Sequence, residues 1–166
     1  MVMIHRTLSQ TDLVTAGAGR RREARPDGQH QLVATGRGHE LGLLPEELPE
    51  HDFVFMHIKK TDSAGEDGDF GRKVAAIEEV DALVPRMLEA GVEVIAVTGD
   101  HSTPAQMAAH SWHPVPVLLW GGTAAADGLP HFDEVNCRQG SLGRFEAKHL
   151  LPQLLAAAGR LTKYGA

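Results

Sequence analysis

An acidic side chain and an imidazole stand side by side where a short apolar run ends. The run at 94–98 (Val-Ile-Ala-Val-Thr) is followed by Gly99, Asp100 and His101. Its β-branched residues predict a buried parallel strand, and in open α/β sheets ligands bind beyond the carboxyl ends of the strands. A carboxylate oxygen and an imidazole nitrogen are good ligands for a divalent transition metal. The pair therefore predicts a metal site, while a helix cap at Asp100 and a polar loop residue at His101 are the alternative interpretation.

A third candidate ligand, Asp62, follows another predicted strand. Residues 52–58 (Asp-Phe-Val-Phe-Met-His-Ile) have the apolar and aromatic composition of a core strand. Residues 63–69 are rich in acids and glycines and predict a loop. Apolar residues near helical spacing predict one long helix over 70–89.

These elements and a strand at 92–98 predict a βαβ unit with a right-handed connection. Its two strands would be neighbours in a parallel sheet, with their carboxyl ends at the same edge. This arrangement places Asp62 close to Asp100 and His101, so the predicted fold itself brings three candidate ligands together.

The remainder of the chain predicts a helix, a strand and another helix. A short helix is expected after Thr103, because Pro104 suits the first turn of a helix. Residues 115–120 predict a strand, in which Pro116 indicates a late start or an edge position. A final helix is expected over 144–161. The predicted fold class is therefore α/β, with a mainly parallel sheet flanked by helices.

Residues 1–50 differ from the rest of the chain in composition. They hold several glycines and the basic run Arg20–Arg22, and they show no period of 2 or 3.6 before Leu41. We expect a poorly ordered extension, with a basic contact surface for a partner as the alternative and a short helix at 41–48. The expected division is an extension at 1–50 and a metal-binding α/β domain at 51–166.

Composition restricts the class of protein. With 166 residues, of which 42% are hydrophobic, the chain can form one core of ordinary size. The net charge of -6 argues against general nucleic-acid binding, and no apolar run reaches membrane-spanning length. Cys137 is the single cysteine, which excludes an intrachain disulfide and a four-thiolate zinc site and fits a cytoplasmic setting. We therefore expect no nucleic-acid partner and no membrane contact.

Four stretches of the sequence resemble one protein family, namely 55–69, 98–104, 110–116 and 140–144. Together they resemble the C-terminal part of a 2,3-bisphosphoglycerate-independent phosphoglycerate mutase of the archaeal type, in the alkaline phosphatase superfamily. The resemblance covers roughly residues 51–166. It implies a truncated alkaline-phosphatase-like core. It also implies an isomerase of glycolysis and gluconeogenesis that interconverts 2-phosphoglycerate and 3-phosphoglycerate.

The resemblance also implies two divalent ions, usually manganese, with magnesium, cobalt or zinc in some members. It makes Asp62 and His110 ligands of one ion, and Asp100 and His101 ligands of the other. Two close ions can clamp the attacking and leaving oxygens of a phosphoryl transfer. The family has a histidine four residues after the first aspartate, where this chain has Glu66. Either the Glu66 carboxylate replaces that ligand and alters the metal preference, or it no longer binds and this ion site is weaker.

The family's N-terminal part supplies a serine nucleophile, and an inserted domain covers the substrate. Nothing before His51 resembles the nucleophile segment, so no catalytic residue is assigned, and without that serine the phosphoenzyme route lacks its covalent carrier. The expected function is the metal-binding part of a mutase acting on phosphoglycerate, incomplete alone. Its expected partner is a chain that supplies the N-terminal half, or another copy in a homo-oligomer. The alternatives are hydrolysis of another phosphomonoester and a non-catalytic metal-binding remnant.

Overall fold

A mixed β-sheet with helices on both faces forms the described part of the chain. The computed structural model describes residues 2–5, 32–35 and 53–161. The helix expected at 41–48, and most of the extension expected at 1–50, lie outside these residues. The strands are β1 (Val2–His5), β2 (Leu32–Thr35), β3 (Phe53–His57), β4 (Val94–Thr98) and β5 (Val117–Gly121). The helices are α2 (Lys60–Glu66), α3 (Phe70–Asp81), α4 (Val84–Glu89) and α5 (Leu150–Ala157), with single 3₁₀ turns η3 (Asn136–Gln139) and η4 (Ala147–His149).

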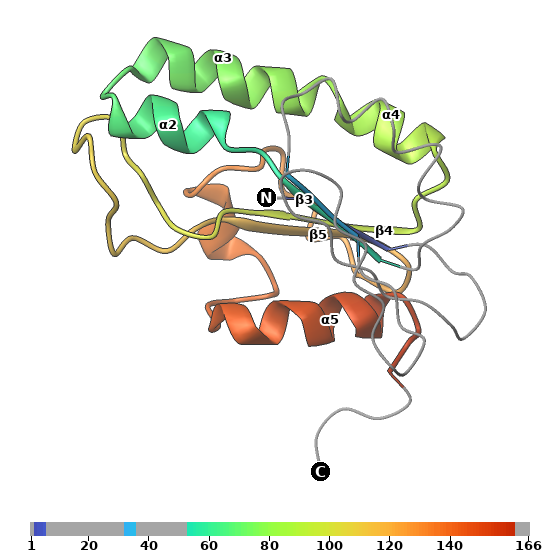
Figure 1. Ribbon diagram of the computed structural model, residues 1–166. Coiled ribbons are helices and arrows are strands. Elements are labelled where there is room, and N and C mark those ends of the chain that lie inside the picture. The colour runs from blue at the N-terminus through green and yellow to red at the C-terminus, as the bar shows by residue number, and fades with distance from the viewer. Residues whose placement is uncertain (1, 6–31, 36–52, 162–166) are drawn as a thin grey trace, which may run out of the picture.

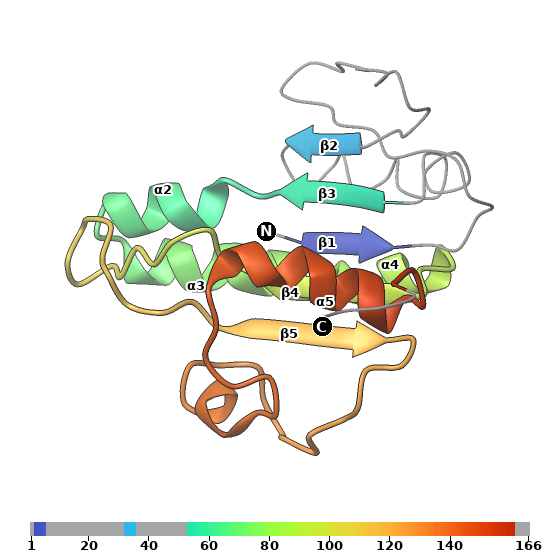
Figure 2. The same cartoon turned by 90° about the horizontal axis from the view of Figure 1, so that it is seen from below.

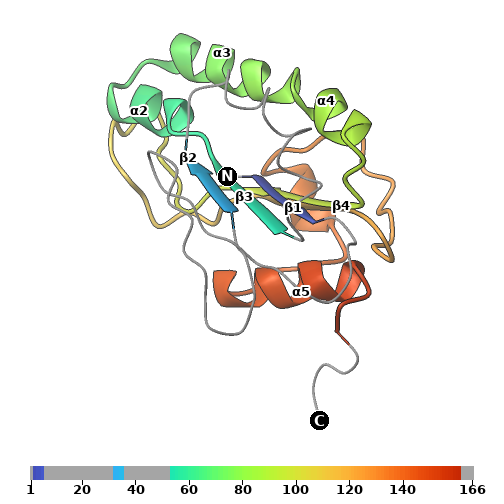
Figure 3. The same cartoon turned by 45° about the vertical axis from the view of Figure 1, so that its right-hand side comes forward.

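Two helical layers enclose the sheet. Helices α2, α3 and α4 lie on one side of it and α5 lies on the other (Figures 1 and 3). Side chains alternate between the two faces along β3 and β4, as the pleat of a strand requires. The core on the α4 side includes Val54, Met56, Met87, Val92 and Ile95. The core on the α5 side includes Phe53, Val94, Ala96, Leu150 and Leu154. Within the described residues, no helix is long and apolar enough to cross a bilayer.

The sheet is mixed, which corrects the expectation of a mainly parallel sheet. Its strand order is β2-β3-β1-β4-β5 (Figure 2). The pair β2·β3 is parallel, whereas β1·β3, β1·β4 and β4·β5 are antiparallel. Strands β2, β3 and β4 therefore share one direction, and β1 and β5 run the other way. The difference has two sources. Strand β1, from the poorly patterned first fifty residues, pairs antiparallel with both of its neighbours, and β5 pairs antiparallel with β4.

The insertion of β1 also changes the expected βαβ unit. Strands β3 and β4 were expected to be neighbours, but β1 lies between them, with Met3 opposite both Phe55 and Ala96. Two strand spacings, about 10 Å, therefore separate β3 from β4. Because β3 and β4 still run in the same direction, their carboxyl ends meet the same edge of the sheet (Figure 2). The segments that follow these two strands must close the remaining distance.

Two helical predictions are wrong at prolines. The helix expected over 70–89 is divided into α3 and α4, and Pro85 lies in the first turn of α4. Proline has no amide hydrogen and its ring clashes with the carbonyl four residues earlier, which here belongs to Asp81 at the end of α3. The helix expected over 144–161 is shorter, because α5 spans only Leu150–Ala157. Proline is tolerated in the first turn of a helix but not in its interior, so Pro152 requires the α-helix to begin close before it.

The segment after Thr103 forms a turn where a short helix was expected. The amide of Met107 donates to the Pro104 carbonyl at 2.9 Å, and Ala108 then has a φ of 46°. A positive φ takes the backbone out of the right-handed helical region, so the turn does not continue as a helix. The expected late start and edge position of the next strand are confirmed, because β5 begins at Val117 and closes one side of the sheet.

Helix α2 occupies most of the segment that was expected to be a loop. It includes Gly65, which costs about 1 kcal/mol relative to alanine inside a helix. The structure shows why glycine is needed there: a Cβ atom at this position would lie closer than 3.0 Å to the backbone carbonyl oxygen of Thr103. The missing side chain lets α2 lie directly against the segment that follows β4.

This close approach predicts an asymmetric response to two glycine-to-alanine substitutions. Gly65→Ala should lower the free energy of unfolding by about 1–3 kcal/mol, because α2 must move away from Thr103. Gly71→Ala is the matched control in α3, where the new Cβ would lie 3.7 Å from the nearest atom, on Asp69. It should leave stability unchanged or raise it by up to about 1 kcal/mol. Urea denaturation measures both, and equal effects would contradict the packing described.

Candidate metal centre

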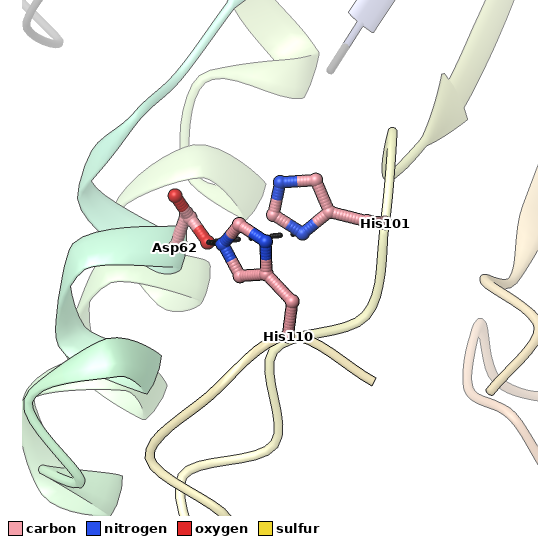
Figure 4. A group of neighbouring side chains, drawn as sticks. All are labelled: Asp62, His101 and His110. Carbon is pink, nitrogen blue, oxygen red and sulfur yellow. Dashed lines mark ion pairs between the residues drawn. The ribbon is translucent and has the colours of Figure 1, made fainter. Parts of the chain in front are cut away.

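Three polar side chains converge at the edge where β3 and β4 end. Asp62 comes from the first turn of α2, His101 follows β4, and His110 follows the turn after Pro104 (Figure 4). Each offers one ligand atom, and these atoms all lie within 4.8 Å of one another. The segments that follow β3 and β4 therefore come together, as expected from the common direction of the two strands, although β1 lies between these strands.

Thr103 holds the first two of these side chains in place. Its hydroxyl donates to Asp62 Oδ1 at 2.7 Å and lies 3.1 Å from His101 Nδ1. Thr103 is only 4% exposed, so these contacts are sheltered from water. One hydroxyl thereby connects α2 to the segment after β4. The sequence analysis gave Thr103 no role in the site, although its position two residues after His101 was a signal that it could contact the candidate ligands.

His110 is held by a short backbone bridge. The amide of Ser111 donates to the Ser102 carbonyl at 2.8 Å, which closes the loop between the two histidines. The rings of His101 and His110 then lie with centroids 3.9 Å apart and planes inclined by 31°. The positive φ of Ala108 lets the chain reverse direction just before this bridge. Backbone geometry, more than side-chain packing, therefore sets the position of His110.

The five predicted ligands form two neighbouring groups of atoms. His110 Nε2 lies 3.5 Å from Asp62 Oδ1 and 3.3 Å from Glu66 Oε1. His101 Nε2 lies 3.7 Å from Asp100 Oδ2, and its other nitrogen lies 3.9 Å from Asp62 Oδ1. Two adjacent ligands of one ion, at metal distances of about 2.1 Å, are roughly 3.0–3.6 Å apart. The separations around His110 fall in this range, whereas the Asp100–His101 pair is slightly wider at 3.7 Å. The carboxylate and imidazole donors suit divalent ions, and Glu66 lies beside the His110 group, where the family resemblance leads us to expect a histidine.

The charge of Asp62 is stabilised against its burial. The side chain is only 11% exposed, and burial raises the pKa of its carboxyl. Hydrogen bonds from Lys59 and Thr103 outweigh burial, and the pKa lies below its ordinary value of 3.8. Lys59 donates to Oδ2, whereas Thr103 and the histidines face Oδ1. The carboxylate is thus kept ionised, as a metal ligand must be.

The sequence matches one family and several curated proteins. The match to the family described as the metalloenzyme superfamily covers residues 43–157. A probable 2,3-bisphosphoglycerate-independent phosphoglycerate mutase from Thermus thermophilus is 48% identical over 143 residues, which are 84% of this chain and 35% of that protein. Proteins of the same name from Thermotoga sp. (strain RQ2) and Thermosipho africanus are 44% and 51% identical, over 82% and 70% of this chain.

The fold is shared with a solved structure from an archaeon. The PH0037 protein from Pyrococcus horikoshii superposes with a TM-score of 0.72 and 37% sequence identity, over 76% of this chain and 39% of that protein. Among the curated relatives, the Thermotoga and Thermosipho matches cover 34% and 29% of the relative. The chain therefore spans about one third of the length of the curated relatives it matches.

The Thr103 hydroxyl predicts a specific change in the titration of Asp62. In metal-free buffer with a chelator, Thr103→Val removes one hydrogen bond and leaves the burial, so the pKa of Asp62 should rise. Carboxyl-carbon NMR titration measures it. Asp127, whose pKa is lowered by hydrogen bonds from Ser141, is the internal control and should not move. An unchanged pKa of Asp62 in the variant would contradict the role given to Thr103.

The same substitution should alter stability in acid, with a sign that follows from linkage. Because the folded pKa of Asp62 is depressed, this group contributes stability above its unfolded pKa and loses it as the pH falls through the folded pKa. In Thr103→Val the depression is smaller, so the acid-dependent loss of unfolding free energy below about pH 4 should be smaller too.

Proposed function

The chain belongs to the metalloenzyme superfamily, and from its ligand cluster we propose that it is the metal-binding part of a 2,3-bisphosphoglycerate-independent phosphoglycerate mutase. The observation that carries the proposal is the convergence of Asp62, His101 and His110 at one edge of the sheet. The names of the curated relatives support the substrate class. Because the chain spans about a third of their length, the activity of the whole enzyme is part of the proposal.

In this proposal the five side chains hold two divalent ions. Asp62, Glu66 and His110 would bind one ion, and Asp100 and His101 would bind the other, following the two groups of neighbouring atoms. Mixed carboxylate and imidazole donors suit manganese or zinc better than calcium. Glu66 adds a hard oxygen donor, which favours manganese or magnesium over softer ions. When bound, the ions would polarise phosphate oxygens and clamp the attacking and leaving groups of a phosphoryl transfer.

The remaining residues of the site orient these ligands. The Thr103 hydroxyl orients the Asp62 carboxylate and, through Nδ1, the His101 ring. The Ser102–Ser111 backbone bridge holds His110 in position. Such supporting contacts commonly change metal affinity by about 10–100-fold when they are removed. The chain would thus bind the ions and set the arrangement of their ligands. Its substrate would be phosphoglycerate or a related phosphomonoester.

The nucleophile would come from outside the described residues. We propose that a polypeptide with the family's N-terminal half supplies it and so completes the active site, and that association with another copy of this chain is the alternative partner. A cytoplasmic setting, expected from the single cysteine, belongs to the same proposal.

An enolase-coupled assay of phosphoglycerate interconversion, with saturating Mn²⁺, tests this function. The purified chain alone should turn over far more slowly than the roughly 1–10³ per second typical of enzymes, because it lacks the covalent carrier. Activity should appear when a polypeptide with the family's nucleophile segment is added. His110→Ala should abolish that activity, whereas His113→Ala should retain it, because His113 contacts Ser111 and lies outside the ligand cluster.

Two outcomes of this assay would contradict the proposal. Full turnover by the isolated chain would show that it needs no completing polypeptide. Equal activity of the completed His110→Ala and His113→Ala proteins would show that the cluster is not used.

A further inference from the structure

A lysine outside the ligand cluster contacts its central carboxylate. Lys59 immediately precedes α2, and its ammonium donates to Asp62 Oδ2. The opposite oxygen of the same carboxylate faces Thr103, His101 and His110. Lys59 and the imidazole ligands therefore occupy the two sides of one carboxylate. The Lys59 side chain is 62% exposed, so its end is free to move.

Lys59 also lies in the field of the other carboxylates of the site. Its hydrogen bond to Asp62 raises the pKa of its ammonium, and Glu66 and Asp100 add electrostatic attraction. Asp62 and Glu66 belong to one proposed ion position, and Asp100 belongs to the other. Lys59 thus places a positive charge beside carboxylates that the proposed divalent ions would also neutralise.

The neighbouring lysines are engaged elsewhere. Lys60 pairs with Glu79 of α3 at 2.7 Å, and Lys73 donates to the Thr103 carbonyl. Lys59 and Lys60 are adjacent in the sequence, but Lys59 contacts Asp62 and Lys60 contacts Glu79. Lys60 is therefore a matched control for any effect of removing a lysine charge near α2.

We propose that Lys59 alternates between two partners: the Asp62 carboxylate in the metal-free chain, and the phosphate group of the substrate in the metal-loaded chain. The inference rests on the proposed function, because it requires ions on Asp62. A divalent ion that shares the carboxylate weakens the attraction between Asp62 and the ammonium, since two cations then compete for the same charge. A phosphate beside the ions offers the released ammonium a doubly charged replacement.

Lysine suits such an exchange because its ammonium is a compact charge on a flexible four-carbon stem, and it binds phosphate as a point charge. The proposal assigns to this site a phosphate contact within this chain, provided by a residue that is not a metal ligand. It predicts that Lys59 weakens the binding of the metal ion, with which it competes for Asp62, and strengthens the binding of phosphate.

The first measurement is calorimetric titration with Mn²⁺ alone, in phosphate-free buffer. Lys59→Met keeps the length of the stem and removes the charge, so Mn²⁺ should bind about two- to fivefold more tightly, the range expected for the loss of an exposed competing ion pair. Lys60→Met should bind Mn²⁺ like the wild type.

The second measurement uses inorganic phosphate on the Mn²⁺-loaded proteins, followed by ³¹P relaxation. Lys59→Met should bind phosphate about tenfold more weakly, as expected for one lost charge-assisted hydrogen bond. Lys60→Met should be unchanged. Lys59→Arg, which restores the charge, should recover most of the phosphate affinity.

The outcomes separate this inference from the proposed function. If wild type binds Mn²⁺ but Lys59→Met binds phosphate as tightly as wild type, the inference is overturned while the proposed function stands. Unchanged Mn²⁺ affinity in Lys59→Met would overturn it equally, because no competition then exists. A wild-type chain that binds no Mn²⁺ would overturn the proposed function and this inference with it.

Discussion

The contact between Thr103 and helix α2 is the constraint on which the rest of the site depends. The Thr103 backbone carbonyl lies against Gly65, where a side chain does not fit, and the Thr103 hydroxyl donates to Asp62. Both contacts come from one buried residue, so the backbone and the side chain of Thr103 together hold α2 against the segment after β4. Because β1 separates β3 from β4, no direct strand pairing could set it.

From this contact the positions of the other candidate ligands follow by backbone connectivity. His101 lies two residues before Thr103, and the Ser102–Ser111 bridge brings His110 back to the same place. Glu66 is one turn beyond Asp62 on α2, so it necessarily shares the face that points at His110. Compared with the histidine of the resembled family, a glutamate at this position offers a carboxylate oxygen in place of an imidazole nitrogen. Where the resembled family has a histidine, this chain therefore presents a carboxylate to His110.

Part of this structure could be predicted from local sequence pattern, and part could not. Strands β3 and β4 follow from apolar and β-branched runs, and the approach of Asp62 to His101 follows from the common direction of those strands. Strands β1 and β2 could not be predicted, because residues 1–50 show no usable period and their pairing partners are distant in sequence. The division between α3 and α4 was visible in Pro85, whose effect the apolar spacing over 70–89 concealed.

The site shows the same division. His110 entered the predicted ligand set through family resemblance, since no spacing rule connects it to Asp62 or His101. Glu66 entered in the same way, because its segment was predicted to be a loop and its helical spacing from Asp62 could not be used. Helix α2 was missed because its glycine and acids suggested a loop, while the reason for Gly65 is a contact with a residue 38 positions away. Thr103 was missed as a positioning residue for the same reason: its partner, Asp62, is 41 positions away.

The central claim is that the segments after β3 and β4 form a site for divalent ions. Its most direct test is a crystal structure of the full chain grown with Mn²⁺, with anomalous data collected at the manganese edge. The account predicts an anomalous peak bounded by Asp62, Glu66 and His110, and a second peak beside Asp100 and His101. Anomalous density that is absent from both positions, with the five side chains ordered and turned toward solvent, would contradict it.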